Sequence, residues 1–478
     1  MSPLLVALLL AFAAAAAAAA AEETQPYLVA LRRESIPVRR KGKVVSHKTS
    51  YSGSISAGTP PQDFSVVFDT GSGHVILPAV DCENETCKLH RRYNASASTS
   101  ATPVNADGTE VVDDEPCDQV TIGFGTGEVT GEFIKDVVCL TGLVPSAASS
   151  SSAAVSAEAA AAPAAFERLC TEVTVVQAVE MSAQPFQAFE FDGILGLGLS
   201  SLALSEEFSF FRWASASGLL PAPRFAFFLA AEDSGGSGGG GGEASEMALG
   251  GINPERALGP LSWAPVARPE LGYWQVEIRA VRVQGVELDV CRSGDCRGVV
   301  DTGASHLGVP APYDEDLEAL LTREAGEGTD CHSIEAPELE IEIPGLNLTL
   351  RPENYMRSLP LRGDIQVKSA IGIVMSDAGK EPSSARAPLL SSSASSSSAA
   401  AAAPPAAATT ASPAAAGTAP GKKRKKRQQC RPRVMPVKLP APLGPKLFIL
   451  GEPVLHRYYT AFDWDTQQVG FALAATRR

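Results

Sequence analysis

The chain contains the tripeptide Asp-Thr-Gly twice, at 69–71 and at 301–303. Two carboxylates held about 3 Å apart cannot both ionise, so they share one proton near the working pH. The ionised carboxylate can then act as a base toward water, and the protonated one as an acid. Such a pair activates water for attack on an amide carbonyl without a metal ion. Asp69 and Asp301 are therefore predicted to be catalytic.

Both tripeptides follow an apolar run that is typical of a buried strand. The first run is Phe-Ser-Val-Val-Phe at 64–68 and the second is Gly-Val-Val at 298–300. Each aspartate is expected where a strand enters a tight turn, in which glycine lets the backbone approach the carboxylate closely. A single copy of so short a motif occurs in ordinary turns. Two copies in matched contexts favour a catalytic pair.

The segments around these turns resemble the pepsin-like aspartic proteases. Residues 51–64 resemble the strand pair that leads into the first catalytic aspartate of that family, 191–197 resemble the segment that crosses behind it, and 447–472 resemble the matching part of the second half. The resemblance extends from about residue 50 to 474, with insertions. It implies a mostly β, bilobal fold with a cleft between two related lobes. It also implies an aspartic endopeptidase that binds a polypeptide substrate in extended form, as an added strand.

The resemblance implies roles for the neighbours of the two aspartates. The threonines of the two turns are expected to tie the catalytic loops together, and the glycines to supply backbone amides. The serine after the first turn is expected to orient Asp69. These supporting residues are Thr70, Gly71, Ser72, Thr302 and Gly303.

The segment 120–131 has the pattern of a hairpin with a glycine-rich tip and resembles the flap of that family. Phe124, Gly125 and Thr126 are expected to cover the substrate. The family usually has Tyr at the position of Phe124 and Trp at that of Ile76, and those two side chains normally form a hydrogen bond. Both are replaced together here, so no buried donor is left unpaired. Ile76 and Phe124 predict an apolar substrate pocket.

Ala304 occupies a position where the family often has Thr, whose hydroxyl can donate to the second aspartate. Loss of one donor to a carboxylate raises the pKa of that carboxyl group. The sequence therefore predicts an activity optimum displaced toward weak acid or neutral pH.

The chain is expected to consist of a leader, a basic segment and two lobes. Residues 1–21 are interpreted as a secretory signal, because an apolar, alanine-rich run ends there in small residues. That run is nearly long enough to be an uncleaved membrane anchor, which remains an alternative. The basic segment 22–48 is either a propeptide or the first strands of a lobe. The N-terminal lobe is assigned to 49–224 and the C-terminal lobe to 225–478. Insertions of low complexity are predicted at 143–165, 235–242 and 380–429.

Two further segments carry local signals. Residues 205–220 begin with Ser and two Glu before an apolar-rich stretch, which predicts a helix from Ser205 onward. The run Lys-Lys-Arg-Lys-Lys-Arg at 422–427 is interpreted as a solvated loop or as a cleavage site for a basic-site processing protease. The leader argues against a nuclear signal.

The nine cysteines fit an oxidising compartment. Pairs are predicted where two cysteines are close in sequence or flank an insertion, which leaves Cys117 over, although spacing alone does not prove pairing. No zinc site is expected, because neither a second cysteine pair nor a His doublet lies near Cys82 at ligand spacing. His74 and His90 are expected to be surface or loop residues. The predicted disulfides are Cys82–Cys87, Cys139–Cys170, Cys291–Cys296 and Cys331–Cys430.

Charge and glycosylation sequons indicate the compartment and the partners. The formal net charge of -14 argues against a nucleic-acid partner. The sequons at Asn84, Asn94 and Asn347 would be glycosylated in a secretory route. We expect a monomeric enzyme that is secreted or lumenal, including an acidic vesicle, vacuole or lysosome-like compartment. No metal, organic cofactor or membrane partner is expected, apart from the anchor alternative. A pepsin-like fold that binds peptides without turnover is the other function that the sequence leaves open.

Overall fold

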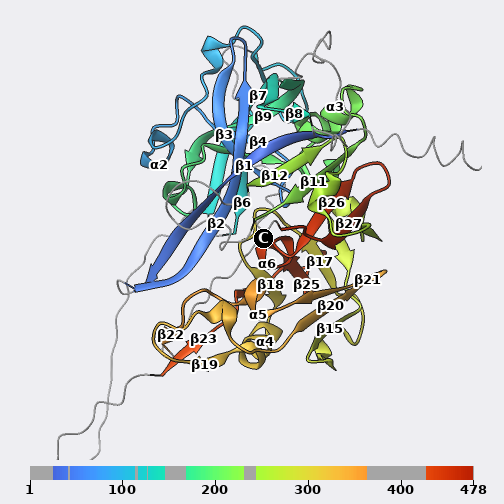
Figure 1. The fold of residues 1–478 in the computed structure, drawn as a ribbon. Coiled ribbons are helices and arrows are strands. Elements are labelled where there is room, and N and C mark those ends of the chain that lie inside the picture. Colours follow the sequence, from blue (N-terminus) through green and yellow to red (C-terminus); the bar gives the residue numbers. More distant parts are fainter. Residues whose placement is uncertain are drawn as a thin grey trace, which may run out of the picture. The chain divides into compact units, whose positions relative to one another are not determined.

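The computed structural model describes residues 25–40, 43–112, 117–125, 127–145, 168–230, 244–362 and 427–476, and these are built mainly from strands (Figure 1). The predicted leader, Thr126, the insertion at 235–242 and most of the other two insertions lie outside the described residues. All described residues belong to one compact unit. None of the described helices is both long and apolar enough to cross a membrane.

The largest sheet has fifteen strands and contains the first Asp-Thr-Gly turn at the end of β3. Thirteen strands follow one another across it, while β6 (Val120–Phe124) pairs with β7 and β8 (Val144–Pro145) pairs with β1. The order across the sheet is β13 (Ser262–Pro265), β27 (Gln468–Leu473), β26 (Tyr458–Asp463), β11 (Arg224–Phe228), β12 (Ser245–Leu249), β1 (Tyr27–Arg40), β2 (Lys43–Ala57), β3 (Gln62–Asp69), β10 (Gly193–Gly196), β4 (Val75–Pro78), β9 (Arg168–Met181), β7 (Gly127–Thr141) and β5 (Thr102–Val104).

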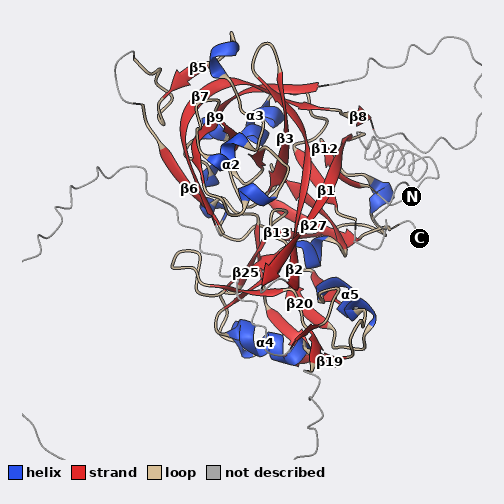
Figure 2. Cartoon of the chain, turned by 90° about the vertical axis from the view of Figure 1, so that its left-hand side faces the viewer, coloured by secondary structure: helices blue, strands red, loops and turns tan. Residues whose placement is uncertain are grey.

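Three smaller sheets and a few short helices complete the described residues (Figure 2). The five-stranded sheet has the order β14 (Gln275–Glu277), β17 (Arg297–Val300), β25 (Leu447–Leu450), β18 (Leu307–Pro310) and β24 (Val434–Val437). The four-stranded sheet has the order β16 (Val286–Glu287), β15 (Ala280–Val283), β20 (Leu339–Ile343) and β21 (Leu346–Leu350). The three-stranded sheet has the order β19 (Arg323–Ala325), β23 (Gln428–Cys430) and β22 (Leu361–Arg362). The α-helices are α2 (Glu85–Lys88), α3 (Phe210–Ala216), α4 (Tyr313–Leu321), α5 (Pro352–Tyr355) and α6 (Glu452–Leu455). Short 3-10 turns lie at Ala95–Ala97, Phe186–Ala188, Ser200–Leu202, Glu206–Phe208, Pro254–Arg256, Pro269–Leu271, Asp289–Cys291 and Cys331–Ser333.

The strand pairing around the first Asp-Thr-Gly turn is repeated around the second. Strand β3 pairs in parallel with β10, which pairs antiparallel with β4. Strand β17 likewise pairs in parallel with β25, which pairs antiparallel with β18. The outer strands also correspond, because β4 is parallel to β9 and β18 is parallel to β24. This duplication delivers each aspartate from a buried strand and confirms the mostly β, two-lobe fold class.

The described part of the basic N-terminal segment forms strands from Tyr27 onward. Strand β1 pairs with β2 from Arg32 to Arg40 and with β12 from Tyr27 to Leu31 (Figure 1, long blue strands). The segment thus forms the first strands of the lobe, which was one of the two predicted alternatives. Its removal as a propeptide stays a prediction. Because β1 joins β2 on one side to β12, β11 and β26 on the other, one continuous sheet crosses the predicted lobe boundary at 224/225.

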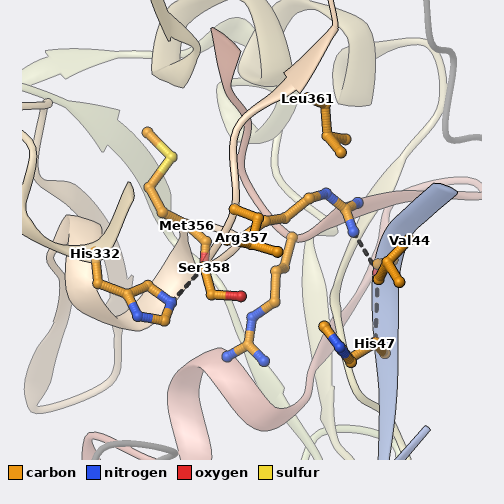
Figure 3. Close-up of a pocket in the computed structure, with 10 residues that line it drawn as sticks. Val44, His47, His332, Met356, Arg357, Ser358 and Leu361 are labelled. Carbon is orange, nitrogen blue, oxygen red and sulfur yellow. Dashed lines mark hydrogen bonds between the residues drawn. The ribbon is translucent and has the colours of Figure 1, made fainter. Parts of the chain in front are cut away.

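Strand β2 also meets the segment that follows α5. Arg357 Nη1 donates to Ser46 Oγ at 2.5 Å, and Figure 3 shows Arg357 reaching toward the strand that carries Val44 and His47. A cavity of about 30 Å³ lies at this contact. The two halves of the chain are therefore also joined by polar side chains, outside the sheet.

A buried ionic group lies at the start of α6. Glu452 Oε2 accepts from Arg433 Nη1 at 2.8 Å, and Glu452 Oε1 accepts from the Tyr51 hydroxyl at 3.0 Å and lies 2.9 Å from His456 Nε2. Burial alone would raise the pKa of Glu452, but Arg433 and His456 together hold it well below its usual range. Glu452 is thus a buried carboxylate whose charge is fully compensated.

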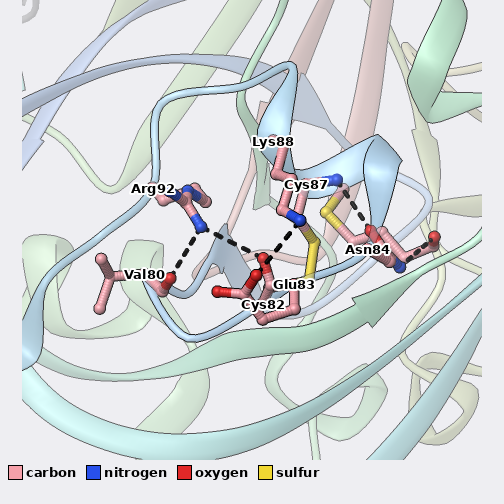
Figure 4. The surroundings of a disulfide bond; sticks show 8 residues. Val80, Cys82, Glu83, Asn84, Cys87, Lys88 and Arg92 are labelled. Atoms are coloured by element: carbon pink, nitrogen blue, oxygen red, sulfur yellow. Dashed lines mark hydrogen bonds and ion pairs between the residues drawn. A yellow bond between two sulfur atoms is a disulfide. The ribbon is translucent and has the colours of Figure 1, made fainter.

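All four predicted disulfides are present, namely Cys82–Cys87, Cys139–Cys170, Cys291–Cys296 and Cys331–Cys430. Cys117 is free. The first disulfide joins Cys82, before α2, to Cys87 within α2, where Asn84 Oδ1 accepts from Cys87 N at 2.9 Å and Asn84 Nδ2 donates to Met181 O at 2.8 Å (Figure 4). The Asn84 side chain therefore already has structural partners on both of its polar atoms.

Three predicted boundaries differ from the structure. The helix expected from Ser205 begins at Phe210, because Glu206–Phe208 is a separate 3-10 turn and Ser205 makes no capping hydrogen bond. The first insertion was placed too early, since Leu143 is buried in the core. The third was extended too far, because β23 begins at Gln428 and pairs with β19 and β22.

Candidate active site

The two Asp-Thr-Gly turns are joined by reciprocal hydrogen bonds between their threonines. Thr70 N donates to Thr302 Oγ1, and Thr302 N donates to Thr70 Oγ1, both at 3.0 Å. The Thr70 hydroxyl donates to Val300 O at 2.8 Å, and the Thr302 hydroxyl donates to Phe68 O at 2.7 Å. Both hydroxyls are buried, so each catalytic turn is fixed by the backbone of the other. Thr70 and Thr302 occupy the places predicted for them.

The glycines of the turns bring the two carboxylates together. Gly71 N donates to Asp69 Oδ1 at 2.9 Å, and Gly303 N donates to Asp301 Oδ1 at 2.8 Å. A Cβ atom at Gly71 would lie 3.0 Å from the Asp301 carboxylate, and one at Gly303 would lie 2.6 Å from Asp69 Oδ1. Each carboxylate therefore uses the space that a side chain on the opposite turn would fill. This is why both turns require glycine.

The two carboxyl groups differ in proton affinity. Burial raises the pKa of Asp69, while the Ser72 hydroxyl, the Gly71 amide and a hydrogen bond from Asp301 oppose that rise. Burial and the negative charge of Asp69 raise the pKa of Asp301 well above its usual range. Asp301 thus keeps a proton that it donates toward Asp69, and Asp69 carries the negative charge. This is the one-proton state expected of two adjacent carboxylates.

Ser72 is buried beside the first aspartate, as predicted, but its role is less direct. Its hydroxyl is close enough to lower the pKa of Asp69. No partner among the described residues, however, meets both the distance and the angle of a hydrogen bond to Ser72 Oγ. The geometry thus favours an electrostatic influence on Asp69 over a fixed hydrogen bond, and the orienting role of Ser72 stays a prediction.

The dyad opens into a cleft of about 620 Å³. Phe124 and Gly125 line it from the tip of the β6–β7 hairpin, as predicted for the flap. Ile76 does not line the cleft, although it was predicted to form the substrate pocket. It packs in a buried apolar cluster, and its strand β4 is paired with β10 on one edge and β9 on the other. The apolar wall is formed instead by Val67, Val120, Ile122, Phe186, Phe189, Phe191, Ile194, Leu202 and Leu204.

Several residues of the site were missed or misjudged from the sequence. His74 was expected to be a surface or loop residue, but it is 7% exposed, lines the cleft and accepts from Leu204 N at 3.1 Å through Nε2. Burial lowers the pKa of His74 to about 4, so it is neutral at physiological pH. His90 is also buried. Tyr273 lines the cleft too, and burial together with the charges of the dyad raises its pKa.

The family model for eukaryotic aspartyl proteases matches residues 50–167 and 167–364. These ranges include both Asp-Thr-Gly turns, the flap hairpin and the strands β3, β10 and β17. The chain belongs to the eukaryotic aspartyl protease family. The predicted family is thereby confirmed.

Curated aspartyl proteases show the same relationship. The chain is 31% identical over 310 residues to cathepsin E of Aquarana catesbeiana, which covers 64% of this chain and 66% of that protein. It is 30% identical over 323 residues to pepsin F of Oryctolagus cuniculus, covering 66% of this chain and 70% of the relative. Pepsin B of Canis lupus familiaris is 26% identical over 430 residues, covering 89% and 81%. The chain thus spans about two thirds of the length of the cathepsin E relatives that it matches.

No group of three or more His, Cys, Asp or Glu side chains arranged to hold a metal ion occurs in the part of the aspartyl protease chain that the structure describes. Asp69 and Asp301 are the only carboxylates among the described residues that line the cleft. They are held by the threonine and glycine contacts given above.

Proposed function

We propose that the chain is an aspartic endopeptidase that hydrolyses peptide bonds of proteins or peptides with water activated between Asp69 and Asp301. The observation that carries this proposal is the convergence of the two carboxylates across Gly71 and Gly303. The raised pKa of Asp301 beside the charge of Asp69 favours one shared proton. Membership of the aspartyl protease family supports the same reaction.

The reaction follows from the protonation of the two groups. The ionised Asp69 removes a proton from a water molecule held between the carboxylates, and the water oxygen attacks the carbonyl carbon of the scissile bond. Asp301 donates its proton to the carbonyl oxygen, which avoids a buried oxyanion. The proton on Asp69 then passes to the amide nitrogen, the C–N bond breaks and the proton of the diol returns to Asp301. The dyad thus ends in its initial state.

The walls of the cleft favour an extended polypeptide with apolar side chains next to the scissile bond. Phe124 on the flap, whose ring lies 5.7 Å from that of Phe186, lines an apolar part of the cleft together with Phe186 and Phe189. An extended peptide could add to the flap as a further strand, with alternate side chains entering pockets. The disulfides fit a secreted or lumenal compartment. We propose that the enzyme acts there as a monomer, with removal of the leader and glycosylation as parts of its maturation.

The proposal is tested by hydrolysis of an unbiased peptide mixture from pH 3 to pH 7, followed by mass spectrometry. The wild-type chain is compared with Asp69→Asn and Asp301→Asn, with and without a statine-type transition-state mimic. We expect cleavage by the wild type that both variants and the mimic abolish.

Absence of cleavage at every pH by a folded wild-type chain, or cleavage that survives both substitutions, would contradict the proposal. In the first case, retained binding of peptides would instead indicate a binding module. Circular dichroism and thermal unfolding of each variant show whether a loss of activity has a folding cause.

A further inference from the structure

Arg357 is a buried arginine on the wall of the cleft. Its side chain is 7% exposed, and its guanidinium donates to Ser46 Oγ at 2.5 Å and lies 3.4 Å from His306 Nε2. Ser46, His306 and Arg357 all line the cleft that contains the dyad. The positive charge is therefore held close to the space that a bound peptide would occupy.

No carboxylate among the described residues lies within ion-pair distance of Arg357. The charge of Glu318 acts on Arg357 from a longer distance, but Glu318 pairs with Arg431 at 3.5 Å, and Glu452 pairs with Arg433 at 2.8 Å. Arg357 Nε has no hydrogen-bond partner among these residues either. Burial, and next the charge of Arg433, lower the pKa of Arg357 to about 10, so it remains charged at physiological pH. Among the described residues, the buried charge of Arg357 has no ion-pair partner, which is costly, and an anionic ligand would relieve that cost.

The same wall of the cleft is cationic. Apart from the two catalytic aspartates, the charged residues among the described lining of the cleft are Arg39, Lys48 and Arg357. His306, between them, is neutral because burial and the charge of Arg357 lower its pKa well below its usual range. The protein as a whole has a formal net charge of -14. The cationic wall is therefore a local feature of the cleft and does not follow from the overall composition.

The small cavity behind Arg357 is too small for an acidic side chain. Its volume is about 30 Å³, which suits one water molecule, and it is lined by His47, His332, Met356 and Leu361 as well as Arg357 (Figure 3). The cleft on the other side has a volume of about 620 Å³. The cleft therefore offers far more room for an acidic side chain beside the guanidinium than the small cavity does.

We propose that Arg357 is a specificity-determining residue that binds the side-chain carboxylate of an Asp or Glu in the substrate. Lys48 and Arg39 on the same wall attract that acidic residue, and the planar guanidinium selects a carboxylate through paired hydrogen bonds. The enzyme should then require an acidic residue at one fixed position relative to the scissile bond, in addition to apolar residues beside it. This inference rests on the proposed endopeptidase function.

The test uses short peptides with a central apolar pair in which one Glu is moved through each flanking position, each compared with the same peptide carrying Gln. The enzymes are the wild type, Arg357→Gln, Arg357→Lys and the control Arg292→Gln, an exposed arginine outside the cleft. For each enzyme, the ratio of kcat/KM for the Glu peptide to kcat/KM for the matching Gln peptide measures the acidic preference in cleavage. Fluorescence anisotropy with the Asp301→Asn variant reports binding when turnover is stopped.

We expect one position at which Glu exceeds Gln by about tenfold or more, the range of a charge-assisted hydrogen bond. Arg357→Gln should bring that ratio close to one, Arg357→Lys should retain part of it, and Arg292→Gln should leave it unchanged. Absence of an acidic preference at every position, or a preference that survives Arg357→Gln, would overturn the inference. If no peptide is cleaved, the proposed function fails. The ratio of the binding constants of the Glu and Gln peptides then still shows whether Arg357 binds the acidic side chain.

Discussion

Replacement of Ala304 by Ser should move the alkaline limb of the pH profile to lower pH. Ala304 is buried on the wall of the cleft, and its backbone amide already lies close enough to Asp301 to lower the pKa of that group. We expect a hydroxyl on the same residue to donate to the Asp301 carboxylate, as the Thr that the family often has at this position can. A hydrogen bond to a charged group contributes about 1.5–3 kcal/mol, and one pKa unit corresponds to about 1.4 kcal/mol. The pKa of Asp301 should therefore fall by about one to two units.

The sign of this shift follows from the state of the dyad. Asp301 has the higher pKa, so its deprotonation ends activity on the alkaline side. A donor that favours the ionised carboxylate makes that loss occur at lower pH. The assay is kcat/KM against pH with a peptide that does not titrate in the range, because this ratio reports the free enzyme. Ala304→Gly, which adds no donor, is the control. An alkaline limb that stays in place or moves upward in Ala304→Ser would refute the reasoning.

Four further predictions concern stability and maturation. Thr302→Val should lower the free energy of unfolding by about 1–3 kcal/mol, because it leaves a buried amide and carbonyl unpaired; Thr302→Ser, which keeps both bonds, should lose much less in the same urea titration. Glu452→Gln should cost about 3–5 kcal/mol near pH 6. Because the folded-state pKa of Glu452 is depressed, the stabilisation by Glu452 is present above its unfolded pKa of about 4.3 and is lost as pH falls through the lower folded value. Equal stabilities of wild type and variant at pH 6 would contradict this prediction. Cys331→Ser, which opens a loop of 99 residues, should cost about 2–5 kcal/mol in the same titration, and an unchanged midpoint would argue against that disulfide. Glycan mapping after expression in a secretory host should find Asn347, which is exposed, occupied more fully than Asn84, whose amide is engaged; the reverse order would count against this interpretation.

The catalytic centre could be predicted from the sequence because its determinants are local and occur twice. Asp69 and Asp301 each follow an apolar strand and precede Thr-Gly. The second copy of this pattern supports the catalytic interpretation of the first. The disulfides were predictable for a related reason, since pairs such as Cys82–Cys87 are close in sequence. Residues that act within one turn or one short loop leave a recognisable pattern.

The specificity determinants could not be predicted, because they come together from distant segments. Arg357, Ser46 and His306 belong to three parts of the chain, and none has a local signal. The burial of His74 was not predicted, because His74 packs against Phe208, a distant residue in the sequence, whose ring lies 5.4 Å from the His74 ring. The helix start was misplaced because burial of Phe210 and Phe211 decides it more strongly than the acidic residues after Ser205.

The parallel pairing of β17 with β25 has a consequence for the order of synthesis. Arg297 pairs with Leu447, about 150 residues later in the chain, so the strand that carries Asp301 has no partner on that edge while the intervening chain is being made. Loop closure over such a distance is slow relative to local contacts. A nascent chain therefore carries the first half of its catalytic pair long before the second can be positioned. The two aspartates are therefore expected to be brought together only after the strand at 447–450 has been made.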